Sequence, residues 1–415
     1  MKTYNPIRGT YDYLPQEARI REIVKHKILT NYQNNGYNII STPILESLEY
    51  LNSSDGGDNL KLIFKTIKRG EKLDLTKENL TEQDIVEEGL RYDLTVPLAR
   101  FYSNNREKLP TPFKSIQIDN VFRAERPQRG RNRQFLQCDI DVIGDKSINA
   151  ELELLKTAVD TYVELGFENL TLKINNRKLL NQLVLFAGFT EADINTVCVT
   201  LDKIDKISVT GVMMELIEKG FDADKINNLV DIINNIQEKG LSVATNYAVE
   251  KSTVEELEYL ISTLKTLTGN KHNIVFDISI VRGQGYYTGT VYEFYTDGFN
   301  GAIGGGGRYD AMIGKITGVD APAVGVSIGF EPVTMLLKER NAEFGSKPSL
   351  ALLYDEDDDI VKVFEAKKTL MAKYNVSLFA RPKNMKSFYE KIMLVASYVT
   401  SYKDYVEGKE VKHLV

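Results

Sequence analysis

Two alternating segments joined by a short polar stretch constrain the fold of this chain more than any other feature. Residues 113–122 (FKSIQIDNVF) and 134–143 (QFLQCDIDVI) alternate along their length, which is the period of a half-buried strand. Pro127 and Gly130 lie between them and favour a turn. The spacing therefore predicts a long antiparallel hairpin within an antiparallel sheet.

Helical periodicity surrounds this hairpin. Residues 18–33 repeat apolar side chains at helical spacing, and residues 177–267 are helical almost throughout, with breaks at Gly188, Gly220 and Gly240. Further strand patterns occur at 170–175, 274–281, 287–296, 299–305 and 323–329. Because strands and helices are segregated, we expect an α+β fold, with an antiparallel sheet core flanked by helices and a helical insertion at about 177–267.

The length of 415 residues indicates more than one domain. We expect a core at 1–340, a linker at 341–348 and a short α/β domain at 349–415. No apolar run approaches the roughly 18 residues of a membrane span, and the first residues lack a secretory signal pattern. These observations predict a cytoplasmic protein.

The supply of cysteine and histidine excludes several classes of site. Cys138 and Cys198 are the two cysteines, so neither a disulfide framework nor a Cys-rich zinc site is expected. His26, His272 and His413 lie far apart, which argues against a histidine metal site or a His-dependent triad. With a net charge of -6, a polyanionic partner would have to meet a local basic patch.

The turn of the predicted hairpin is rich in arginine. Five arginines fall within residues 123–135. A solvated hairpin tip would account for them, but the planar guanidinium matches phosphate oxygens bidentately, which a lysine does not. We therefore favour a polyphosphate ligand.

Polar side chains follow on the return strand. Gln137, Asp139 and Asp141 share one face of this strand because side chains alternate. Carboxylates on a face that also lines a core must be satisfied, either by a bound ammonium group or by salt bridges to the neighbouring arginines.

Two glycine-rich runs occur later, at 282–290 (RGQGYYTGT) and 304–310 (GGGGRYD). Glycines inside strands mark close approach of a ligand or of another backbone. Neither run is a Walker loop or a Rossmann fingerprint. Tyr286, Tyr287 and Tyr309 could line a polar-aromatic pocket there, although tyrosines in strands are more often core.

Five segments together resemble a known family. They are GLRYDLTVPLARF (89–101), FRAERPQRGRNRQFLQCDIDVIG (122–144), VRGQGYYTGTVYEF (281–294), GGGGRYD (304–310) and AVGVSIGFE (323–331). In this order they closely resemble the motifs of histidyl-tRNA synthetases, over about residues 7–340. The resemblance implies a class II synthetase core, a ligase that uses ATP and Mg²⁺ to join histidine to tRNA(His), and a homodimer formed through residues 37–51.

The resemblance also implies roles for individual residues. Arg123 and Arg282 would be catalytic. The residues that bind ATP would be Arg123, Glu125, Arg131 and Phe135. Those that bind histidine would be Asp93, Thr95, Gln137, Asp141, Arg282, Tyr286, Tyr287 and Tyr309. Arg126 and Gln128 would meet the acceptor end of the tRNA, and no side-chain metal site is assigned.

One position departs from the family pattern. Pro332 occupies the place of the arginine that clamps the γ-phosphate in motif 3. Losing one such donor costs on the order of 3 kcal/mol, or about a hundredfold in rate, unless Arg131 or Arg133 compensates. An alternative is therefore a histidine-binding regulatory paralogue similar to the ATP phosphoribosyltransferase regulatory subunit. The segment 349–415 lies where the family has its anticodon-binding domain, but it is short.

Overall fold

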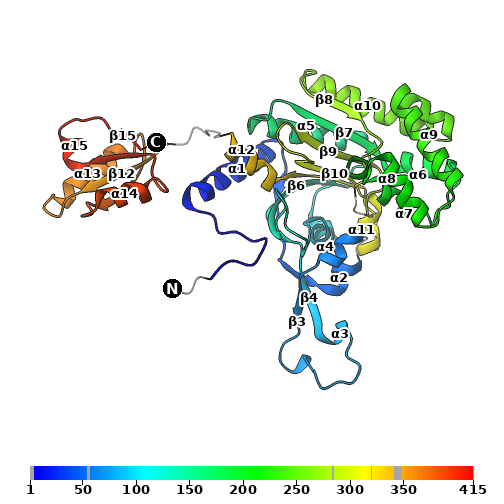
Figure 1. Cartoon of the computed structure of the whole chain (residues 1–415), viewed down its shortest axis with the longest axis horizontal. Coiled ribbons are helices and arrows are strands. Elements are labelled where there is room, and N and C mark those ends of the chain that lie inside the picture. The colour runs from blue at the N-terminus through cyan, green and yellow to red at the C-terminus, as the bar shows by residue number, and fades with distance from the viewer. Residues whose placement is uncertain (1–3, 54–56, 283–284, 319, 341–346, 415) are drawn as a thin grey trace. The chain divides into compact units, whose positions relative to one another are not determined.

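The computed structural model describes residues 4–53, 57–282, 285–318, 320–340 and 347–414 (Figure 1). The chain forms two compact units: Met1–Thr10 with Val24–Leu336, and Tyr11–Ile23 with Leu337–Val415. The predicted linker at 341–348 lies largely outside the described residues. No helix in the described part of the chain is long and apolar enough to cross a membrane.

An eight-stranded mixed sheet forms the centre of the large unit, in the order β1-β5-β6-β11-β10-β9-β7-β8. Its strands are β1 (Asn38–Ile39), β5 (Phe113–Phe122), β6 (Gln134–Ile143), β7 (Leu170–Asn176), β8 (Asn273–Phe276), β9 (Thr290–Thr296), β10 (Gly304–Arg308) and β11 (Ala323–Gly329). The inner strands, from β5 to β7, are antiparallel, whereas β1 and β8 pair with their neighbours in parallel. The predicted α+β class and antiparallel core are thus confirmed, with parallel edges that the sequence did not indicate.

The hairpin forms where it was predicted. β5 and β6 have the predicted bounds and pair from Phe113↔Ile143 to Phe122↔Gln134. The strand predicted at 299–305 is wrong in position, because β10 consists of four glycines and Arg308. A Cβ at Gly306 would lie 2.0 Å from the Gly325 carbonyl oxygen, so only glycine fits there. Tertiary contact, not β propensity, determines this strand.

Helices flank the sheet of the large unit. They are α1 (Pro15–Asn34), α2 (Leu48–Ser53), α4 (Thr95–Asn105), α5 (Ile148–Glu164), α11 (Asp310–Thr317) and α12 (Phe330–Glu339). The 3₁₀ segments are η1 (Gly57–Leu62), η2 (Gly70–Lys72), η3 (Arg106–Lys108) and η4 (Leu241–Tyr247). Both α1 and α12 contain residues of the two units, since residues 15–23 of α1 and 337–339 of α12 belong to the small unit.

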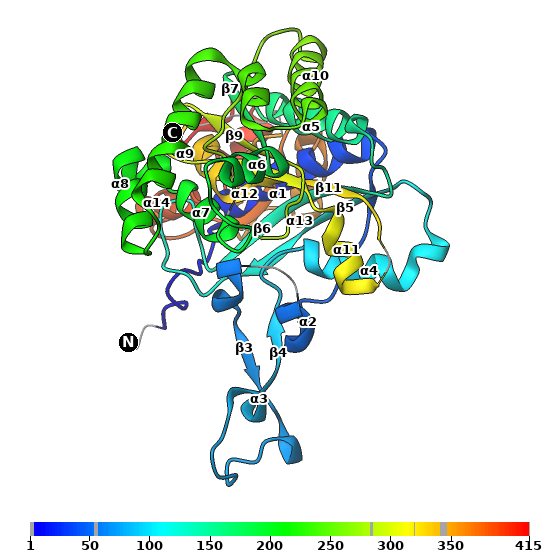
Figure 2. The same ribbon diagram turned by 90° about the vertical axis from the view of Figure 1, so that its right-hand side faces the viewer.

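The segment 177–267 is helical, as predicted. It contains α6 (Arg177–Phe186), α7 (Ile194–Leu201), α8 (Ile204–Glu218), α9 (Ala223–Lys239) and α10 (Lys251–Leu267). These helices are grouped together and coloured green in Figures 1 and 2. Gly188, Gly220 and Gly240 follow helix ends with φ of 103°, 87° and 93°, a left-handed conformation that glycine adopts without strain.

A second, three-stranded sheet projects from the large unit in both views (Figures 1 and 2). Its strands are β2 (Leu45–Ser47), β3 (Lys65–Ile67) and β4 (Val86–Leu90), in the order β2-β4-β3. Between β3 and β4 the chain passes through η2 and α3 (Glu82–Ile85), and β4 then pairs with β3.

The small unit contains a four-stranded sheet in the order β13-β12-β14-β15. Its elements are β12 (Ser349–Tyr354), α13 (Ile360–Leu370), β13 (Asn375–Ala380), α14 (Met385–Ile392), β14 (Tyr398–Ser401), α15 (Tyr402–Val406) and β15 (Lys412–His413). β12 pairs in parallel with β13 and β14, which is the arrangement expected of a small α/β module. Its core includes Leu353, Ile392 and Val399.

Candidate active site

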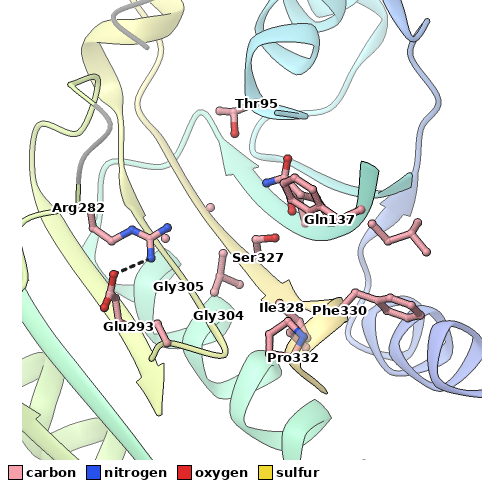
Figure 3. Close-up of a pocket in the computed structure, with 18 of the residues that line it drawn as sticks. Thr95, Gln137, Arg282, Glu293, Gly304, Gly305, Ser327, Ile328, Phe330 and Pro332 are labelled. Atoms are coloured by element: carbon pink, nitrogen blue, oxygen red, sulfur yellow. Dashed lines mark hydrogen bonds and ion pairs between the residues drawn. The ribbon is translucent and has the colours of Figure 1, made fainter. Parts of the chain in front are cut away.

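A cavity of about 250 Å³ lies on one face of the central sheet, over β6, β10 and β11. The register brings polar and small residues together there: Asp139 pairs with Ser327, and Asp141 pairs with Gly325. Figure 3 shows Arg282 and Glu293 on one side, Thr95 and Gln137 on the other, and Ser327 between them. Ten residues of the predicted site line the cavity: Thr95, Arg123, Arg131, Phe135, Gln137, Asp141, Arg282, Tyr286, Tyr287 and Tyr309.

Glycines make room for these side chains. A Cβ at Gly325 would lie 1.9 Å from Asp141 Oδ1, and one at Gly305 would lie 2.4 Å from Arg282 Nη1. A Cβ at Gly307 would lie 2.8 Å from the ring of Tyr287. The glycine-rich strand β10 thus marks close approach of another backbone, as predicted, since Cβ atoms at Gly306 and Gly307 would meet the carbonyl oxygens of Gly325 and Thr290. At Gly305 and Gly307 the site's own side chains approach as well.

Four buried acceptor atoms in and beside the cavity have no hydrogen-bond donor among the described residues. They are Asp93 Oδ2, Gln137 Oε1, Asp139 Oδ1 and Asp141 Oδ2. None of the described arginines forms an ion pair with Asp139 or Asp141, so the salt bridges that the sequence left open as one alternative are not found there. Buried acceptors in native proteins are nearly always satisfied. The arrangement therefore fits a ligand that carries several N–H donors.

The pKa values of the carboxylates in this group are raised above their ordinary values. Burial raises the pKa of Asp141 to about 7, although the hydrogen bond that Tyr309 donates to it at 2.6 Å lowers this pKa. Burial also raises the pKa of Asp93 to about 6, while the Val96 N–H, which donates to Asp93 at 3.1 Å, lowers it. For Asp139, burial and then the charge of Asp141 raise the pKa well above its usual range. A bound cation would reverse these shifts.

Two arginines approach the same cavity from separate segments. Arg123 follows β5; its Nε donates to the Tyr92 carbonyl at 3.0 Å, and its guanidinium carbon lies 5.1 Å from the centre of the Phe135 ring. Arg282 Nη1 donates to Glu293 Oε1 at 3.1 Å (Figure 3). The structure therefore brings the two predicted catalytic arginines to one site.

The three tyrosines belong both to the core and to the cavity. The ring of Tyr286 lies 4.8 Å from that of Tyr287 and 6.1 Å from that of Tyr309, between centroids. All three also line the cavity, and Tyr309 donates to Asp141. The tyrosines are thus core residues and cavity-lining residues at the same time.

Comparisons with known proteins show the family of this chain. The model of the family described as Histidyl-tRNA synthetase matches residues 9–333. The chain belongs to the histidyl-tRNA synthetase family. It is 38% identical over 400 residues to a histidine–tRNA ligase from Leifsonia xyli subsp. xyli, covering 93% of this chain and 92% of the relative. A histidine–tRNA ligase from Bacteroides fragilis is 36% identical over 348 residues, or 80% and 76% of the two chains.

Solved structures agree on the fold. The crystal structure of a histidyl-tRNA synthetase from Nostoc sp. PCC 7120 superposes with a TM-score of 0.77 at 24% identity, covering 100% of this chain and 95% of that one. A structure from Bacillus halodurans C, described as an ATP phosphoribosyltransferase regulatory subunit/histidyl-tRNA synthetase, gives 0.75 at 18% identity and covers 97% and 98%. The fold alone therefore does not separate synthetase from regulator, whereas the relatives above are named as ligases.

Four of the residues that the synthetase resemblance selects do not line the cavity. Asp93 is buried next to it, with Oδ1 accepting the Val96 N–H at the start of α4. Glu125 is half-buried, and its carbonyl oxygen accepts a hydrogen bond from Arg133 Nε at 3.0 Å. Arg126 and Gln128 are exposed on the hairpin turn, away from the lining.

Pro332 lines the cavity at the position that the motif 3 arginine occupies in the family pattern. It lies in the first turn of α12, where proline is tolerated because its N–H would lack a helical partner. A Cβ at Gly130 would lie 3.7 Å from Pro332 Cβ, so the motif 2 turn is next to it. Arg131 lines the cavity and Arg133 does not, which favours Arg131 as the compensating cation.

Ser327, Glu293 and Glu331 also line the cavity. They lie within the matched motif segments, but the resemblance assigned them no role. Ser327 and Glu293 lie on the same cross-strand row as Gly305 and Asp139, and only the register brings this row together. Glu331 directly follows Phe330 at the start of α12, and its Oε1 accepts the Leu136 N–H at 3.3 Å.

Proposed function

We propose that this protein is a histidine–tRNA ligase, which converts histidine and ATP to histidyl-adenylate and pyrophosphate and then transfers histidine to tRNA(His). One observation carries the proposal. Buried acceptors without donors lie beside Arg123 and Arg282 in a single cavity of a chain that belongs to the histidyl-tRNA synthetase family. An amino acid that bears an ammonium group and ring N–H donors would satisfy the first group, and a triphosphate the second.

In the activation step, the ammonium and ring nitrogens of histidine would donate to Asp93, Gln137 and Asp141, with Thr95 and the three tyrosines around them. The substrate carboxylate is already ionised at neutral pH and needs no general base. One of its oxygens bonds to the α-phosphorus while the bond to the pyrophosphate oxygen breaks. Arg123 and Arg282 would align the groups and stabilise the developing charge.

The nucleotide would occupy the arginine end of the cavity. Phe135 offers an aromatic face for the adenine, Glu125 a carboxylate for its amino group, and Arg131 a cation for the outer phosphates. Mg²⁺ would arrive with ATP, since it is usually held by one or two carboxylates and substrate phosphates. Glu331 is a lining carboxylate at this end that fits such a role.

Transfer to tRNA would use the exposed turn of the motif 2 hairpin. Arg126 and Gln128 are exposed there and would meet the acceptor end, and the terminal ribose hydroxyl would displace the adenylate. We further propose that the small unit binds the anticodon, that residues 37–51 form a homodimer interface, and that the protein acts in the cytoplasm.

Histidine-dependent exchange of pyrophosphate into ATP, followed by charging of tRNA(His), tests the proposal. The wild-type protein should support exchange with histidine and not with other amino acids. The regulatory alternative is not favoured, because relatives that are 38% and 36% identical to this chain are named as ligases. Histidine binding without exchange, both in the wild type and in Pro332→Arg, would instead support the regulator.

A further inference from the structure

The backbone at Arg282 is strained. Its φ is +61°, in the left-handed region, where an arginine is disfavoured because its Cβ crowds the following carbonyl group. Among the described residues, four other non-glycine residues have positive φ, and none of them lines the cavity. Strain of this kind at a site persists only when surrounding contacts hold it.

A contact from the helical insertion holds this backbone. The N–H of Arg282 donates to Asp202 Oδ1 at 3.0 Å, across 80 residues of sequence. Asp202 is the C-terminal cap of α7, directly after Leu201, and its own N–H donates to the Cys198 carbonyl at 3.0 Å. The carboxylate is therefore fixed to a helix and not to a free loop.

A different element holds the other end of the same residue. Glu293 on β9 accepts from Nη1, and the guanidinium lies over Gly305, where a Cβ would come within 2.4 Å. Tyr295 donates to the second oxygen of Glu293 at 2.5 Å and so orients it. Two carboxylates thus hold Arg282: Asp202 of the insertion accepts from its backbone N–H, and Glu293 of the sheet accepts from its guanidinium.

We propose that Asp202 is a positioning residue for activation: through the Arg282 backbone, the helical insertion sets the direction of the guanidinium in the cavity. This inference rests on the proposed function. It makes the insertion part of the activation site, because a displacement of the end of α7 moves the backbone that carries Arg282.

The test compares Asp202→Ala with Asp202→Asn in pyrophosphate exchange. Alanine removes the acceptor, and we expect kcat to fall about 10- to 100-fold with the KM for histidine within about threefold. Asparagine keeps an oxygen that accepts the same N–H, and should restore kcat to within about threefold of wild type. Asp222→Ala is the matched control. Asp222 caps α9 in the same insertion through the N–H groups of Asp224 and Lys225 and does not contact Arg282, so kcat should not change.

A double-mutant cycle separates positioning from general destabilisation. In an Arg282→Ala background, Asp202→Ala should reduce kcat no further, because the residue through which it acts is gone. Wild-type kcat in a folded Asp202→Ala variant, or an equal loss in both backgrounds, would overturn the inference. If the wild type shows no exchange, the proposed function fails and ATP affinity replaces kcat as the readout. Asp202→Ala must then weaken ATP binding, with rescue by asparagine, or the inference fails too.

Discussion

Protonation of Asp141 and Asp93 should weaken histidine binding about a hundredfold when the pH falls from 7.5 to 5.5. In the unbound site the pKa is about 7 for Asp141 and about 6 for Asp93. A bound ammonium stabilises their ionised forms, so the protons must leave on binding. Over this interval, protonation lowers the affinity by about 25-fold through Asp141 and about fourfold through Asp93. The product corresponds to about 2.7 kcal/mol.

Calorimetric titration of histidine into the wild type and into Asp141→Asn measures this effect. The variant should bind more weakly at pH 7.5, yet lose about 25-fold less affinity than the wild type on acidification, because Asp141 no longer titrates. Protonation of the histidine ring affects both proteins equally and cancels in their ratio. An affinity ratio between wild type and variant that is the same at both pH values would refute the argument that Asp141 holds a proton in the unbound site.

Three further predictions follow from the same contacts. Because the pKa values of Asp93 and Asp141 are raised, their protonation stabilises the unbound protein at low pH, and this stabilisation is lost as the pH rises from about 4 to 7. Histidine should therefore raise the Tm of the protein more at pH 7.5 than at pH 5.5. Equal Tm shifts at the two pH values would count against this prediction. Gly325→Ala should displace Asp141, because Asp141 Oδ1 would lie 1.9 Å from the new Cβ. Asp141 would then lose the hydrogen bond from Tyr309, which should lower kcat/KM for histidine in pyrophosphate exchange by about 10- to 150-fold. The KM for ATP should not change and serves as the control. Pro332→Arg should speed exchange by up to about a hundredfold; an unchanged rate would mean that Arg131 already compensates fully.

The sequence predicted best what is locally encoded. Alternation defined β5 and β6 to the residue, and glycine breaks located the helices of the insertion. The same reasoning misplaced β10, because four glycines have no β propensity and form a strand only where neighbouring strands exclude every Cβ. It also gave no indication of α4 or α11.

The candidate site shows the same division. Motifs selected ten lining residues, since each motif is short and its residue types suit phosphate or ammonium. Ser327, Glu293 and Asp202 were not selected. Ser327 and Glu293 lie within matched motifs, but only the strand register shows that they reach the cavity. Asp202 reaches Arg282 through a contact 80 residues away, which leaves no local pattern.

The charge around the nucleotide end explains why Pro332 matters. The charged lining residues among those described are Arg123, Arg131, Arg282, Asp139, Asp141, Glu293 and Glu331. If the two aspartates face the ammonium-bearing ligand, three arginines and two glutamates remain for the nucleotide, a net charge of one positive. A magnesium-bound ATP carries about two net negative charges, and the ion's own charge must be included in such a sum. The arginine that the family places at motif 3 would supply the second positive charge. The site as built is one cation short of balance, so Pro332→Arg should lower the KM for ATP as well as raise kcat. A change in kcat alone would instead indicate that the missing arginine acts only on the transition state.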